Sequence, residues 1–171
     1  MPKRNTSVAA KSPPRNDGLW HFACALYAKP GVAPACLALQ DEYGADVPLL
    51  LAALWHGRCG RGRLSAARAK RWKAIARAWR SQIVAPLRQA RRALKASEVP
   101  EAAELYAAVK RAELAAEKLQ LDALERDAAA RSVRAAHAQR EDAQANARLV
   151  LQRGKNAPAL LKIFSALREA P

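Results

Sequence analysis

Two pairs of histidine and cysteine are the residues of this chain whose types and spacing could bind a metal ion. His21 precedes Cys24 by three positions, His56 precedes Cys59 by the same interval, and Cys36 is a further thiol. Zinc takes four nitrogen or sulfur ligands in tetrahedral geometry, and this set could supply them. The spacings match no zinc finger, however, and buried thiols with a hydrogen-bonded histidine explain the pattern better. We therefore expect no metal site and no cofactor.

Acidic residues offer a second candidate for chemistry. Glu113 and Glu117 lie one helical turn apart, and paired carboxylates of this kind bind metals in helical bundles. Such sites need a matching second pair, which Asp122, Glu125 and Asp127 do not form. We expect these carboxylates to be solvated or in salt bridges. The chain also contains no Gly-x-Ser-x-Gly, P-loop or dinucleotide-binding pattern, so we predict no catalytic residue.

The clearest chemical signal is a basic segment. Between Asp46 and Glu98 the chain has thirteen Lys or Arg residues and no Asp or Glu, in a chain whose net charge is +15. A basic excess this concentrated points to an anionic partner. Drawn as a helix, residues 65–96 place Trp72, Trp79 and other apolar side chains on one face, and Lys and Arg on the other. We expect both tryptophans to lie in the core.

The predicted polyanion-binding surface consists of basic residues of this helix and of the loop before it. A row of Arg and Lys over several turns can neutralise successive phosphates, and Arg can bind a phosphate through two nitrogens. Arg77, Arg80, Arg88 and Arg91 are predicted to face solvent. The full set is Arg58, Arg61, Arg63, Lys70, Lys73, Arg77, Arg80, Arg88, Arg91, Arg92 and Lys95.

An alternative gives part of this charge a structural role. Glu101, Glu104, Glu113 and Glu117 of the next helix could fold back antiparallel and pair with some of the basic residues. Such pairing cannot remove the excess, because residues 98–171 are nearly neutral on their own. High arginine content in a GC-rich genome would also raise the charge without serving a function.

Helices must position all of these residues. The composition is rich in Ala and Arg and poor in Gly and β-branched residues, which favours helix throughout. We predict an all-α, single-domain helical bundle of six or seven helices, with a disordered basic tail over residues 1–16 and a helical domain over 17–171. The expected helices cover 18–29, 32–43, 47–56, 65–96 with a kink or split at Pro86, a helix that follows Ser97 and runs past Leu124, and a short final helix from Pro158.

Local signals set several of these boundaries. Asp17, Asp46 and Ser65 are predicted N-caps, and Gly44 is a predicted C-terminal stop. The helix over 47–56 is apolar on all sides, so it should lie at the centre of the core. Residues 128–148 lack large apolar side chains, and we expect a weakly packed segment there, either a solvated helix or partly mobile.

The composition also favours a cytoplasmic protein. Three cysteines are an odd number, and the Pro-rich N-terminal residues lack the apolar stretch of a secretory signal. The longest apolar run, over 47–55, is far too short to span a membrane. We therefore expect free, mostly buried thiols and no membrane partner, and the oligomeric state stays open.

A distinctive set of residues runs through much of 18–120. It consists of Leu19-Trp20-His21-Phe22, Tyr27, Pro30-Gly31-Val32, Cys36-Leu37-Ala38-Leu39-Gln40-Asp41, Gly44, Asp46-Val47, Leu49-Leu50-Leu51 and Trp55, and later of Trp79, Pro86-Leu87-Arg88, Arg91-Arg92, Leu94-Lys95, Leu105-Tyr106, Lys110, Glu113-Leu114 and Ala116-Glu117. In this set the chain resembles an uncharacterised proteobacterial family of small helical proteins. The resemblance is most specific over residues 19–55 and fades near residues 128–148. It implies a bacterial, cytosolic helical domain of unknown function, with no activity or cofactor to carry over.

Three functions remain open at this point. The leading one is a non-catalytic module that binds a polyanion, such as RNA, the ribosome or DNA, through the basic face over residues 58–95. The second is a helical adaptor that binds an acidic protein partner through the same face and residues 128–148. The third is an enzyme that acts on an acidic or phosphorylated small molecule near Gln40, Asp41 and Arg88. An enclosed polar pocket would favour the third function, and a flat convex basic face would favour the first two.

Overall fold

The computed structural model describes residues 18–99, 102–129 and 140–168, and the regular structure in these ranges is entirely helical. The elements are α1 (Leu19–Tyr27), α2 (Val32–Tyr43), α3 (Val47–Arg58), α4 (Ala66–Trp79), the π-helix η1 (Arg80–Val84), α5 (Ala85–Lys95), α6 (Ala102–Ala129), α7 (Arg140–Val150) and α8 (Pro158–Arg168). Because α4, η1 and α5 form one continuous helical run, the described residues contain seven helices. The all-α prediction is confirmed, and the predicted basic tail over residues 1–16 lies outside the described residues.

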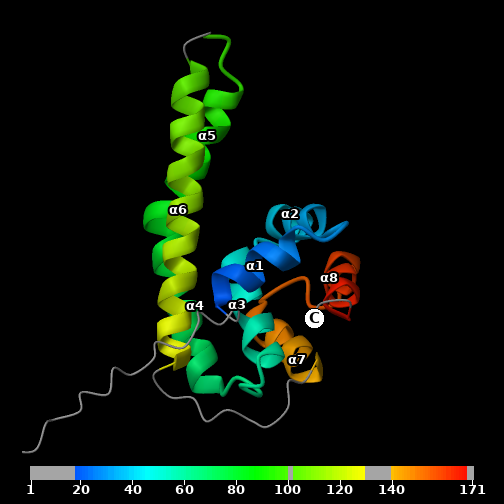
Figure 1. The fold of residues 1–171 in the computed structure, drawn as a ribbon. Coiled ribbons are helices and arrows are strands. Elements are labelled where there is room, and N and C mark those ends of the chain that lie inside the picture. The colour runs from blue at the N-terminus through cyan, green and yellow to red at the C-terminus, as the bar shows by residue number, and fades with distance from the viewer. Residues whose placement is uncertain (1–17, 100–101, 130–139, 169–171) are drawn as a thin grey trace, which may run out of the picture.

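The short helix α3 lies at the centre of the molecule, as its apolar sequence predicts. Asp46 caps its N-terminus: the carboxylate oxygen Oδ1 accepts a hydrogen bond of 2.8 Å from the backbone N–H of Leu49. Every residue from Pro48 to Gly57 is buried. Helices α1, α2, α4, α6 and α7 all pack against α3, so α3 supplies the surface on which the other helices are positioned (Figure 1).

Helix α7 differs from the predicted weak packing of residues 128–148. Ala143, Asn146 and Ala147 are buried, and α7 packs along α3. The physical reason is a close approach of the two backbones: a Cβ atom placed on Gly57 would lie 2.2 Å from the backbone nitrogen of Ala143. Small side chains permit this contact and therefore do not signal a solvated helix here. Residues 130–139 of the predicted segment lie outside the described residues.

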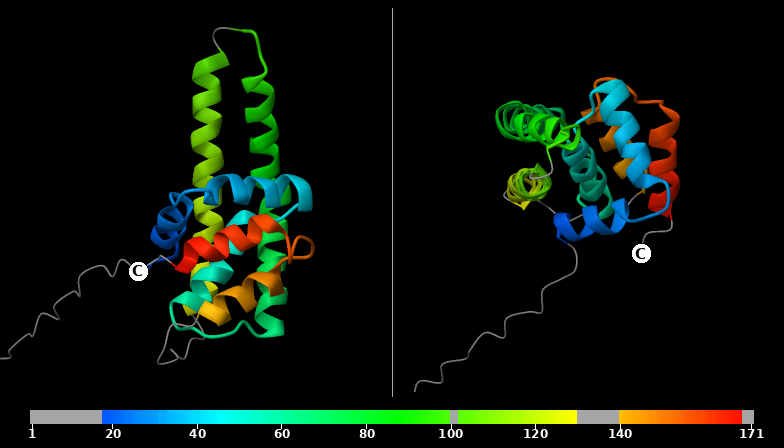
Figure 2. Two further views of the ribbon diagram at one scale, coloured as in Figure 1. Left: turned by 90° about the vertical axis from the view of Figure 1, so that its right-hand side faces the viewer. Right: turned by 90° about the horizontal axis from the view of Figure 1, so that it is seen from above.

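Helices α5 and α6 form an antiparallel hairpin that projects beyond the other helices (Figure 1 and Figure 2). No residue of α5 is fully buried. The predicted kink or split at Pro86 takes the form of the π-helical turn η1, which directly precedes α5 and keeps the helical run continuous. Proline lacks a backbone N–H and crowds the preceding turn, and the wider π turn accommodates both effects.

Other local predictions hold with small changes. Ser65 caps α4 by accepting a hydrogen bond of 3.2 Å from the N–H of Arg68. Gly44 ends α2 in the left-handed conformation, with φ of 66°. Gly18 is the residue at the N-cap of α1, and Asp17 lies outside the described residues.

Among the cysteines, only Cys36 is fully buried, whereas Cys59 is half-buried and Cys24 is exposed, contrary to the expectation of mostly buried thiols.

A test of helix length and apolar composition finds no single described helix that could cross a membrane. Helices α1 and α2 pass that test only as a pair, and they meet at an angle of 100°.

Candidate polyanion-binding groove

The eleven basic residues predicted to bind a polyanion do not share one surface. One group lines a groove along α4, a second forms ion pairs, and a third lies at the end of α3 and in the loop that follows it. Lys95 is exposed at the end of α5. The groove group is Lys70, Lys73, Arg77 and Arg80; the ion-paired group is Arg63, Arg88, Arg91 and Arg92; the third group is Arg58, the last residue of α3, and Arg61 in the loop.

The basic groove, as we call it, is a cavity of about 790 Å³ between α4 and two loops, the one from α2 to α3 and the one from α7 to α8. Positions 70, 73, 77 and 80 fall within about 80° of one another on a helical wheel, so one side of the helix presents all four cations. Arg153, from the loop after α7, adds a fifth cation to the lining. The surface is hollowed, not the flat convex face that we expected for a binding module.

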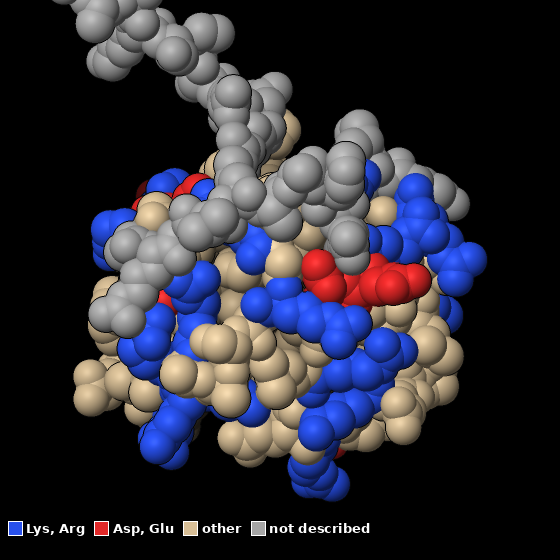
Figure 3. Space-filling model, turned by 90° about the horizontal axis from the view of Figure 1, so that it is seen from below, with Lys and Arg blue, Asp and Glu red and all other residues tan. Residues whose placement is uncertain are grey.

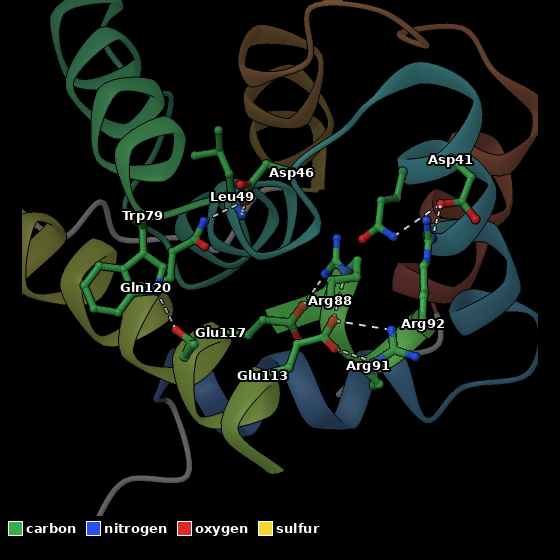
Figure 4. Close-up of polar contacts among 12 residues, drawn as sticks. Asp41, Asp46, Leu49, Trp79, Arg88, Arg91, Arg92, Glu113, Glu117 and Gln120 are labelled. Atoms are coloured by element: carbon green, nitrogen blue, oxygen red, sulfur yellow. Dashed lines mark hydrogen bonds and ion pairs between the residues drawn. The ribbon is translucent and has the colours of Figure 1, made fainter. Parts of the chain in front are cut away.

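Acidic side chains are nearly absent from this groove. Among the residues that line it, Asp46 is the only acid, and its carboxylate is occupied by the α3 N-cap and by a hydrogen bond of 2.7 Å from the side-chain amide of Gln120 (Figure 4). Burial raises the pKa of Asp46. Lys70, Lys73 and Arg77 form no ion pair with any residue in the described ranges. These three side chains can therefore bind an external anion without first breaking an internal salt bridge.

Arg80 and Arg153 involve the two loops that form the rest of the groove. Arg80 donates a hydrogen bond of 2.6 Å from Nη1 to the backbone carbonyl of Gly44, so its guanidinium is held at the groove edge. Arg153 is distant in sequence from the basic segment, and only the packing of α7 against α3 brings its loop alongside α4. Sequence reasoning missed Arg153 because no local pattern marks it.

The prediction that Arg88 and Arg91 face solvent is wrong. Arg88 donates from Nε to Glu113 Oε1 at 2.8 Å and from Nη2 to Glu117 Oε1 at 2.6 Å, while Arg91 Nε donates to Glu113 Oε2 (Figure 4). The side chains of Arg88 and Glu113 are only 15% and 8% exposed. We call these four residues the paired cluster. The alternative of antiparallel pairing is thus confirmed for Glu113 and Glu117, because the hairpin packs α5 on α6; Glu101 lies outside the described residues, and Glu104 forms no ion pair with the described part of the chain.

The two carboxyl groups of the paired cluster respond differently to their surroundings. Burial raises the pKa of Glu113, but hydrogen bonds from Arg91 and Arg88 outweigh burial, and the net pKa lies below the usual value. Burial also raises the pKa of Glu117, and there the single bond from Arg88 does not compensate, so the net pKa lies above the usual value. Glu113 is therefore the carboxylate whose charged form the two arginines stabilise.

Basic residues near the start of α4 also have internal partners. Arg68 and Arg71 lie 3.6 and 3.2 Å from the carboxylate of Asp127, which also accepts a hydrogen bond of 2.8 Å from the indole of Trp72. Arg61 donates to the carbonyl of Ala128. Much of the face at this end of the molecule is covered by Lys and Arg, with acidic side chains gathered mainly in one patch (Figure 3).

The core prediction holds for one of the two tryptophans of α4. Trp72 is fully buried in the core, as predicted. Trp79 is half-buried and does not belong to the core; its indole donates a hydrogen bond of 2.8 Å to the carbonyl of Ala116 and so joins α4 to α6.

His56 has no free nitrogen for a metal ion. Its Nδ1 lies 3.1 Å from the carbonyl of Gly62 and its Nε2 lies 3.1 Å from Arg68 Nη1. The carbonyl can only accept and the guanidinium can only donate, so the ring is neutral with its proton on Nδ1. Burial lowers the pKa of His56 to about 4. The described residues contain no cluster of three or more His, Cys, Asp or Glu side chains placed to hold a metal.

Comparison with known proteins identifies the family. The family described as "Protein of unknown function (DUF2390)" matches residues 18–124. The chain belongs to this family. The match confirms the resemblance to a family of unknown function. It includes the whole of the segment over 58–95, so the basic groove's α4 wall and the paired cluster both lie within the family region. No curated protein and no solved structure matches the chain.

Proposed function

We propose that the protein is a non-catalytic module that binds nucleic acid through its phosphate backbone, held in the basic groove. The observation that supports this proposal is that Lys70, Lys73 and Arg77 line one groove and form no ion pair with any described residue. Folding leaves these charges unneutralised although acids elsewhere in the molecule pair with arginines of the same helical run. Unpaired cations gathered on one side of a helix attract an anionic ligand.

The dimensions of the row suit a phosphate backbone. From Lys70 to Arg80 the helix rises by about 15 Å, at 1.5 Å per residue. A nucleic-acid strand carries one phosphate for about every 3.4 Å of duplex axis, so several phosphates lie within reach of the row. The cations can thus contact successive phosphates of one strand.

A nucleic acid fits the groove better than an acidic protein does. Alongside the cations, α4 presents Ala66, Ala74 and other small residues to the groove. Protein interfaces depend on large apolar or aromatic anchors that fill pockets, and the α4 wall offers none. Contacts to phosphates need only positioned cations, and they bind without regard to base sequence.

The test is a salt-titrated binding assay with a fluorescent RNA and a DNA duplex of mixed sequence. The triple variant Lys70→Ala/Lys73→Ala/Arg77→Ala should weaken binding similarly for every sequence. On duplex DNA it should reduce the slope of log affinity against log salt by about 2.7, from about 0.9 for each lost phosphate contact. Thermal melting should change little, because these side chains make no ion pair with a residue that the structure describes.

A matched control separates the groove from total charge. Arg111→Ala/Lys162→Ala/Arg168→Ala removes the same charge from exposed positions outside the groove and should leave the salt slope nearly unchanged. Equal losses in the two triple variants would show that only net charge matters. Capture of protein partners that survive nuclease treatment and are lost in the groove variant would favour the acidic-protein function instead.

A further inference from the structure

A second cavity lies between α1 and α2 on one side and the α5–α6 hairpin on the other. It has a volume of about 550 Å³ and shares no lining residue with the basic groove. Cavities of roughly 300–1,000 Å³ are typical of sites for small molecules. Gln40 and Arg88, which the sequence analysis left as possible pocket residues, both line it, whereas Asp41 does not. We call this cavity the hairpin pocket.

Three walls of the hairpin pocket expose large apolar side chains. Tyr27 of α1, Leu37 of α2 and Leu114 of α6 are 37%, 50% and 54% exposed, and all three line the cavity. Leu51 and Leu121 are buried and also contribute to the lining. Apolar surface that several elements turn toward one concavity is typical of a binding site. This part of the pocket suits the apolar body of a ligand.

The other part of the pocket offers an unused hydrogen-bond donor. Arg88 donates from Nε and Nη2 to Glu113 and Glu117, and its Nη1 donates to no residue in the described ranges. In the close-up, one nitrogen of Arg88 points away from both glutamates (Figure 4). The two carboxylates fix the guanidinium plane, so Nη1 is held in one orientation.

The charges around the pocket favour an anion. Four cationic side chains line it, against two carboxylates. Lys110 is exposed and forms no ion pair with the described part of the chain, and Arg92 has only an exposed pairing with Asp41, which lies outside the lining. The cations are Arg88, Arg91, Arg92 and Lys110, and the carboxylates are Glu113 and Glu117.

We propose that the hairpin pocket binds a small organic carboxylate with an apolar body, of the size of a medium-chain fatty acid. The apolar body lies against Leu37 and Leu114, and the carboxylate accepts hydrogen bonds from Arg88 Nη1 and from Lys110. This site is independent of the nucleic-acid groove, because the two cavities are lined by different residues.

Cys24 provides a direct reporter of occupancy. It lines the hairpin pocket and is exposed, whereas Cys36 is buried and burial raises its pKa to about 12. A thiol is reactive as its thiolate, so N-ethylmaleimide should modify Cys24 and spare Cys36. Mass spectrometry after timed modification of the full chain gives the rate at each cysteine separately. Octanoate should slow modification of Cys24 several-fold, while 1-octanol and octyltrimethylammonium at the same concentrations should not.

Variants at exposed positions test the two halves of the pocket without endangering the fold. Lys110→Ala should weaken octanoate protection by about two- to fivefold, as expected for one exposed ion pair. Leu37→Ser/Leu114→Ser should weaken it by about tenfold through lost apolar contact. Lys162→Ala and Leu161→Ser alter exposed positions of α8 outside the pocket and should leave protection unchanged.

Three results would overturn the proposal. One is equal protection by 1-octanol and octanoate, which would mean that the charge is not recognised. Another is full protection in the Lys110→Ala and Leu37→Ser/Leu114→Ser variants, which would place octanoate elsewhere. The third is no slowing of Cys24 modification at any octanoate concentration below micelle formation. Because the groove variants do not touch this pocket, each outcome is separable from failure of nucleic-acid binding.

Discussion

Helices α4 and α5 belong to one helical run and carry the same kind of side chains, yet their cations have different environments. On α4, Lys70, Lys73 and Arg77 line a groove with no ion pair to a described residue. On α5, Arg88 and Arg91 are largely covered by Glu113 and Glu117 of α6. The difference comes from what packs alongside each half, and it teaches that a basic run in a sequence is not yet a basic surface.

The largest effect should come from removing the acid that joins the paired cluster. Glu113→Ala leaves Arg88 and Arg91 without their shared partner in a mostly covered site, and breaking a buried pair in this way costs about 3 kcal/mol of unfolding free energy. Chemical denaturation measures the change. Glu104→Ala removes an exposed acid from the same helix and should change stability by less than about 0.5 kcal/mol. If the loss of stability from Glu113→Ala were as small as that of the control, the ion pairs of Arg88 and Arg91 would not stabilise the fold.

Acid should weaken the fold through His56. The pKa of His56 is about 4 in the folded protein, against an ordinary value of 6.5, so the unfolded chain binds a proton that the folded protein does not. Stability contributed by the neutral ring is present above pH 6.5 and is lost as the pH falls toward 4, by about 3 kcal/mol.

Urea denaturation at several pH values measures this loss. His56→Gln should show a flatter dependence over that window, and a slope equal to that of the natural chain would exclude His56 as the cause. Oligonucleotide affinity should hold wherever the protein stays folded, because His56 is not among the residues that line the groove.

Removing two cations from α4 or two from α5 tests the difference between these helices most directly. Lys73→Ala/Arg77→Ala should lower the salt slope for duplex DNA by about 1.8 and change the unfolding free energy by less than about 0.5 kcal/mol. Arg88→Ala/Arg91→Ala should do the reverse, with a clear loss of stability and an unaltered slope. If both doubles lowered the slope alike, the paired cluster would be part of the nucleic-acid site.

The smallest effect should come from the exposed ion pair that lies beside the paired cluster. Arg92 lies 3.1 Å from Asp41, with both side chains more than half exposed, at 60% and 55%. A double-mutant cycle with Arg92→Ala and Asp41→Ala should give a coupling energy below about 1 kcal/mol, because water and salt screen such pairs. A larger coupling would show that this pair positions α5 on α2.

Much of the fold is predictable because its signals are local. Asp46, Ser65 and Gly44 act on backbone groups within a few residues, and the apolar helix α3 has no stable place except the core. The packing of α7 was not predictable from its own composition, because its small side chains allow contact only where Gly57 of another helix lacks a Cβ. Two residues far apart in sequence carry that signal together.

The candidate site also has features that the sequence predicts and features that depend on tertiary packing. The shared side of the groove cations of α4 follows from their helical spacing, and the acids able to pair with α5 were visible as Glu113 and Glu117. Which arginines those acids would cover was not visible, since it depends on the register of the α5–α6 hairpin. The place of Arg153 in the groove could not be predicted, because it depends on tertiary packing. The same holds for the hairpin pocket, whose lining comes from α1, α2, α3, α5 and α6.

The contact of Gly57 with Ala143 has a consequence for where this protein can be cut. The family match ends at residue 124, but the helix that covers α3 begins at Arg140. A fragment that stops at the family boundary would expose the α3 surface that α7 covers, and the surface of α2 that α8 packs on. The family region is therefore shorter than the set of helices that pack together, and a shortened chain meant to keep α3 and α2 covered should retain the residues through Arg168.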